Sequence, residues 1–104
     1  MTTTTNSTPS LEALRAKAEL TADRRAWALD AVRFEDDRMR EAVRDLERAG
    51  TARFATWGNC AAAAGEVTLR ATHLQNACRK YLEALTADRE ARQAVRAAER
   101  RAAS

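Results

Sequence analysis

Every glycine of the chain lies in one central stretch, between Gly50 and Gly65, and the single proline is Pro9. The segments on either side, 11–49 and 66–102, therefore lack the two residues that most often end a helix. Ala, Arg, Glu and Leu dominate both segments, and all four favour helix. The sequence thus predicts an all-α single domain over 10–102. We expect a long antiparallel hairpin of helices 10–49 and 66–102, with a bend over 50–65 that contains one short helix.

Apolar residues of the first segment recur at alternating steps of three and four, the 3.5-residue seam of a coiled coil. They are Leu11, Leu14, Ala18, Ala22, Leu29, Val32, Met39, Val43 and Leu46, and Arg25 and Asp36 interrupt them. A similar seam runs from Val67 to Leu85, beyond which Asp88 and Arg92 take seam positions and the end of the chain is expected to fray. So thin a seam favours self-association, most simply as a dimer that forms a four-helix bundle.

One pentapeptide occurs twice. Leu20-Thr-Ala-Asp-Arg24 recurs as Leu85-Thr-Ala-Asp-Arg89. A hairpin folded near residues 54 and 55 brings the two copies to the same height, because they lie equally far from the fold point. A repeat this short also arises by chance in a composition so biased, and it is not a solenoid repeat.

The charge balance differs between the two halves. Residues 1–50 hold nine Arg and Lys against ten Asp and Glu, whereas residues 51–104 hold nine against five. The second half is therefore the better candidate for an anionic partner such as nucleic acid. The alternative is a solvated helix face, since the basic clusters are short and interrupted by acids.

The sequence indicates a cytoplasmic protein. No apolar run approaches the ~20 residues that a membrane span needs, and the N-terminus lacks the basic start and apolar core of a secretory signal. Residues 1–9 are polar and Thr-rich, which predicts a disordered tail. Cys60 and Cys78 are too few for a disulfide framework, so reduced thiols are expected.

The bend residues suggest a structural role. Gly50 is expected to end the first helix, and Asn59 to cap the short helix that follows. Phe54 and Trp57, with Gly58, are predicted to form a plug that seals the closed end of the hairpin.

No residue pattern indicates catalysis. Cys60, His73 and Cys78 lack the paired spacing of a structural zinc site, and no residue is placed to orient His73 for a Cys–His pair. The chain has no Gly-rich phosphate loop and no convergent carboxylate pair. We therefore expect no enzyme, no metal, no cofactor and no small-molecule substrate.

Residues 57–76 resemble the helix-turn-helix of DNA-binding proteins. Ala61 and Gly65 lie four apart, as the tight helix crossing of that motif needs, and Leu74 falls on a core position. Glu66 and Ala71 depart from the motif, which has larger apolar residues there. The resemblance implies a degenerate motif at 59–76 in a DNA-binding accessory or regulator. Its candidate DNA contacts are Arg70, Thr72, His73, Gln75, Asn76, Arg79 and Lys80.

A helical hairpin of this length with Trp57-Gly58 at its bend also resembles the WXG100 family of small secreted proteins of Gram-positive bacteria. The chain lacks the spacer of that family's Trp-x-Gly turn. Its segment Tyr81–Leu85 lacks the acidic residue of the family's Tyr-x-x-x-Asp/Glu tail signal. This resemblance implies a secreted helical partner protein.

Taken together, the residues favour a small, non-catalytic helical interaction or assembly protein that forms a homo-oligomer or binds a helical protein. The DNA-binding accessory and the secreted hairpin are the alternatives.

Overall fold

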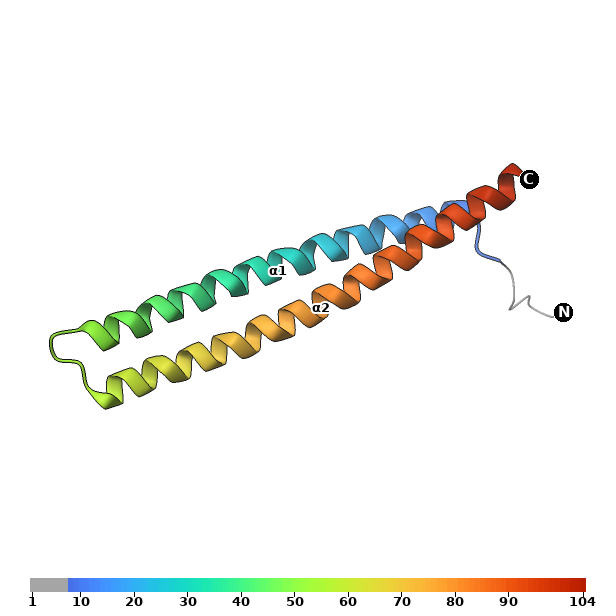
Figure 1. The fold of residues 1–104 in the computed structure, drawn as a ribbon. Helices are drawn as coiled ribbons and strands as arrows, with labels where there is room; N and C mark the ends of the chain where they lie inside the picture. The colour runs from blue at the N-terminus through green and yellow to red at the C-terminus, as the bar shows by residue number, and fades with distance from the viewer. Residues whose placement is uncertain (1–7) are drawn as a thin grey trace.

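The computed structural model describes residues 8–104, which form two helices. Helix α1 spans Leu11–Thr51 and helix α2 spans Trp57–Ala103. The helices run antiparallel and contact each other along their length, with the loop at one end and the described ends of the chain at the other (Figure 1). The Cα extents of 77 × 31 × 13 Å describe a thin, elongated hairpin. The predicted all-α hairpin is confirmed; the predicted tail at 1–9 lies almost entirely outside the described residues.

Helix α1 begins where a side chain can cap it. The backbone N–H of Ala13 donates to Ser10 Oγ at 3.1 Å, and Glu12 places a negative charge in the first turn. The helix does not stop at Gly50, as the sequence suggested, but includes it and ends at Thr51. The φ angle of Gly50 is not positive, so this residue does not form the left-handed C-terminal turn that glycine often provides. The chain leaves the helix because Ala52 is extended.

Helix α2 begins at Trp57, so the short helix predicted at the bend is the first part of α2. Thr56 is the cap, with Oγ1 accepting a hydrogen bond from the Asn59 backbone N–H at 3.1 Å, and the cap predicted at Asn59 is wrong. Gly65 remains in the helix without a positive φ. The strong helix-forming run Ala61–Ala64 precedes it, and a single glycine there costs only about 1 kcal/mol.

Contrary to the prediction, the C-terminal part of α2 does not fray. The helix continues to Ala103, and Ala91 and Ala98 are buried against α1. Near the open end, Arg15 of α1 also pairs with Glu99 of α2 at 3.1 Å. Small alanines therefore fill the buried α2 positions in this part of the seam.

The contact between the helices follows the predicted three–four spacing, written here as heptad positions a and d. In α1 the a positions are Ala18, Arg25, Val32, Met39 and Leu46, and the d positions are Leu14, Thr21, Ala28, Glu35 and Ala42. In α2 the a positions are Val67, Leu74, Tyr81, Asp88 and Val95, and the d positions are Arg70, Ala77, Ala84, Ala91 and Ala98. Among residues 8–104, the buried apolar residues are all alanines: Ala42, Ala77, Ala91 and Ala98. The hairpin thus closes on small residues.

Candidate interaction surface

A polar cluster lies in the seam, near the open end. Asp88 of α2 is only 2% exposed. One of its oxygens accepts a hydrogen bond from Arg25 at 3.0 Å and lies 3.2 Å from Arg92. The Thr21 hydroxyl lies 3.3 Å from the other oxygen and 3.0 Å from the Ala18 carbonyl oxygen, and can donate its hydrogen to either. The carboxylate is thus paired with charge from both helices.

This cluster explains two interruptions of the sequence pattern. Arg25 breaks the apolar seam of α1 and Asp88 breaks that of α2, and the hairpin brings them together. A buried carboxylate is strongly destabilising without enough partners, so the register that adds Arg25 to Arg92 is favoured. The pair was missed from the sequence because each seam was considered alone. The signal was present, since opposite charges interrupt the two seams within about one helical turn of the same height.

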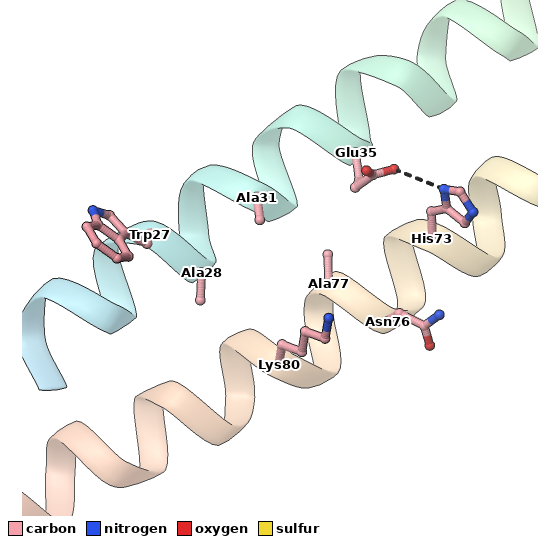
Figure 2. Close-up of a pocket in the computed structure, with 8 residues that line it drawn as sticks. All are labelled: Trp27, Ala28, Ala31, Glu35, His73, Asn76, Ala77 and Lys80. Atoms are coloured by element: carbon pink, nitrogen blue, oxygen red, sulfur yellow. Dashed lines mark ion pairs between the residues drawn. The ribbon is translucent and has the colours of Figure 1, made fainter.

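A second polar pair lies nearer the middle. Glu35 and His73 point towards each other between the helices, with Glu35 Oε2 3.8 Å from His73 Nδ1 (Figure 2). That carboxylate oxygen is buried and has no hydrogen-bond partner among the described residues. The pair lies in a groove of about 460 Å³, also lined by Trp27, Ala28, Ala31, Asn76, Ala77 and Lys80.

One side of the hairpin carries a continuous row of large apolar side chains, here called the apolar face. They occupy the a positions and the adjacent e positions of both helices, and each is only half-buried. The members are Leu29, Val32, Met39, Val43 and Leu46 of α1, and Val67, Leu74, Cys78, Tyr81, Leu85 and Val95 of α2. Residues at a, d and e form the core-facing stripe of helices that pack in bundles. The apolar face therefore has the pattern of a bundle core with one side uncovered.

The opposite side of the seam, here called the tryptophan face, is different. Its exposed apolar residues are Leu20, Trp27 and Phe34 of α1, spaced seven apart, and Leu69 of α2. The indole of Trp27 lies on the side of α1 away from α2 (Figure 2). The Arg38 guanidinium lies 5.7 Å from the Phe34 ring centroid, a cation–π contact that covers part of this exposed ring.

The predicted plug at the closed end is wrong. Phe54 is 79% exposed and Trp57 is 86% exposed, and Gly58 is exposed as well. The loop of residues 52–56 is too short to fold back over the helix ends, and the Phe54 ring is covered on one side only by the Arg53 guanidinium, at 5.4 Å. Nothing therefore seals the bend within one hairpin.

The helix-turn-helix predicted at 59–76 is also wrong, because these residues belong to the uninterrupted helix α2. Without a turn, no recognition helix can cross a supporting helix. Among the candidate DNA contacts, Gln75, Asn76, Arg79 and Lys80 are exposed, and Asn76 and Lys80 also line the groove of the tryptophan face. The remaining three have partners within the hairpin: Arg70 pairs with Glu66 at 2.8 Å, Thr72 donates to the Thr68 carbonyl, and His73 faces Glu35.

Two further observations concern metals and membranes. Residues 8–104 contain no group of three or more His, Cys, Asp or Glu side chains that could hold a metal ion, and Cys60 and Cys78 are free and half-buried. Neither of the two described helices combines the length and apolar character needed to cross a membrane.

Comparison with known proteins gave no relative. The chain matches no protein-family model, no curated protein and no solved structure.

Proposed function

We propose that the chain is a small, non-catalytic helical assembly protein, whose hairpin is half of a larger helical core. The observation that carries this proposal is the contrast between the buried alanines of the seam and the uncovered apolar face. The hairpin completes its core by packing that face against further helices, supplied by its own copies or by a helical partner protein.

The surface area supports this proposal. A compact monomer of 11.5 kDa exposes about 5,800 Å², whereas this chain exposes 8014 Å². The excess is about 2,200 Å². Burying one Leu or Val side chain fully contributes about 1.5–3 kcal/mol, and the partly exposed residues of the apolar face hold some of this contribution in reserve.

The proposal is tested by thermal unfolding of the isolated chain, followed by circular dichroism over a hundredfold range of protein concentration. We expect either a melting temperature that rises with concentration, because assembly stabilises the folded state, or a monomer of only marginal stability. A chain that stays monomeric and unfolds cooperatively at one high, concentration-independent temperature would contradict the proposal.

Matched variants identify the face that is used. Leu29→Glu with Leu85→Glu places two carboxylates on the apolar face without entering the a and d seam, so the helices of one hairpin can still pair. Trp27→Glu with Phe34→Glu makes the same change on the tryptophan face. The first variant is expected to lose the concentration dependence and the second to keep it. Equal behaviour of the two variants would count against the apolar face.

A further inference from the structure

We infer that the occupant of the apolar face is a second copy of this chain, related by a two-fold axis and oriented so that the two loops lie at opposite ends. This inference rests on the proposed function and adds to it the identity and orientation of the partner. Its parts are the extent of the apolar face, the distribution of charge along the hairpin, and the uncharged rim of α2.

The extent of the face suits one partner of equal size. Its main part runs over 29–46 in α1 and 67–85 in α2, so both helices contribute nearly equal lengths. A stable interface buries about 800 Å² on each partner, which is within the excess area that this chain exposes. A two-fold dimer brings the same patch of both copies together. Two hairpins joined in this way give four helices around one core of a, d and e residues.

The charge distribution selects the orientation. Residues 26–87 hold nine Arg and Lys and nine Asp and Glu, so the whole net charge of +3 lies in the remainder, at the open end of the hairpin. A dimer with both loops at one end would bring two such basic ends together. With the loops at opposite ends, the basic ends are separated by about the length of α1, roughly 60 Å. That is far beyond the Debye length of about 8 Å at physiological salt.

The rim of α2 fits the same orientation. When the loops lie at opposite ends, the two-fold axis sets α2 of one copy against α2 of the other. Beside the apolar face, the middle of α2 presents Thr68, Gln75 and Leu82 at successive heptad positions, and none of them is charged. Leu82 is 60% exposed in the single hairpin. Two such rims can approach without burying an unpaired charge.

The test measures distances between spin labels in the full chain, with Cys60→Ala and Cys78→Ala to remove the native thiols. A label at Ala55→Cys marks the loop, and a label at Arg79→Cys marks the middle of α2 on its solvent side. We expect the two loop labels of a dimer to be more than ~50 Å apart and the two mid-helix labels less than ~35 Å apart, given the ~60 Å length of α1. Leu29→Glu with Leu85→Glu should abolish the mid-helix distance, while Trp27→Glu with Phe34→Glu should leave it unchanged.

Three outcomes would overturn the inference. A short distance between loop labels would show that the loops lie at the same end. Loss of the distance in the Trp27→Glu, Phe34→Glu variant, and not in the other, would place the dimer on the tryptophan face. The absence of any distance between chains at 200 µM protein, with helicity retained, would exclude the second copy. In that last case a marginally stable monomer would still support the proposed function, because another helical protein could then complete the core. A highly stable monomer would contradict both the inference and the proposed function.

Discussion

The two copies of Leu-Thr-Ala-Asp-Arg lie side by side in the hairpin, yet the same residues serve opposite purposes in them. In the first copy Thr21 is buried and Asp23 is exposed. In the second copy Asp88 is buried, and the exposed Thr86 hydroxyl donates to the carbonyl of Leu82 in its own helix. The buried threonine of one copy meets the buried aspartate of the other.

The difference shows that a residue's environment depends on its phase relative to the seam rather than on its immediate neighbours. Residues two apart on a helix point in directions about 200° apart, so only one of Thr and Asp can face the other helix in each copy. In the first copy Thr21 faces the other helix, and in the second copy Asp88 does. The same pentapeptide therefore supplies its own matched control for each prediction below.

The largest effect is expected when Asp88 loses both cations. Arg25→Ala with Arg92→Ala leaves a buried carboxylate with only Thr21 as its partner, which should lower the free energy of unfolding by about 3 kcal/mol. The control is Arg24→Ala with Arg89→Ala, which removes the exposed final arginine of each copy and should change it by less than about 0.5 kcal/mol per site. Urea unfolding at one fixed protein concentration measures the free energy of unfolding of both double variants. Equal losses would show that general charge, and not the Asp88 cluster, sets the stability.

A smaller loss is expected from removal of the carboxylate itself. Asp88→Ala should lower the free energy of unfolding by about 2 kcal/mol. The loss is smaller because Arg25 and Arg92 are 41% and 48% exposed and can turn towards water. Asp23→Ala, the equivalent change in the other copy, should have almost no effect. Chemical denaturation measures the free energy of unfolding of both variants. A larger loss for Asp23→Ala than for Asp88→Ala would contradict the assigned role of Asp88.

The smallest effect concerns the hydroxyl groups. Thr21→Val keeps the shape of the side chain and removes the hydroxyl beside Asp88, which should cost about 1 kcal/mol. Thr86→Val removes only an exposed hydrogen bond to the preceding turn and should cost less than about 0.5 kcal/mol. Melting temperatures measured side by side are sufficient for this test. A larger shift for Thr86→Val would mean that the exposed copy contributes more than its contacts indicate.

The sequence was a good guide to the regular parts of the molecule. Two long breaker-free segments predict two helices, and the repeated pentapeptide predicts their relative height, which the contact between Thr21 and Asp88 confirms. The three–four spacing also identified the a positions of both helices. In α1 it was one residue off at the d positions, since it gave Ala22, Leu29 and Val43 where the structure has Thr21, Ala28 and Ala42. These features follow from local propensity and helical periodicity, which act on neighbouring residues.

The bend was harder to predict, because several residues compete for the same role. Gly50, Thr51 and Ala52 can each end a helix, and Thr56 and Asn59 are both good caps. The exposure of Phe54 and Trp57 depends on the length of the loop, which that competition sets. The side of the seam on which Trp27 lies follows only once the heptad positions of both helices are known.

The central claim is that one hairpin is an incomplete core and that a second copy completes it. Sedimentation equilibrium of the unmodified chain, from 1 to 200 µM at neutral pH, tests that claim directly. We expect a mass that approaches twice the 11.5 kDa of one chain at the higher concentrations. A mass of 11.5 kDa at every concentration, for a chain that remains helical and unfolds cooperatively, would contradict it.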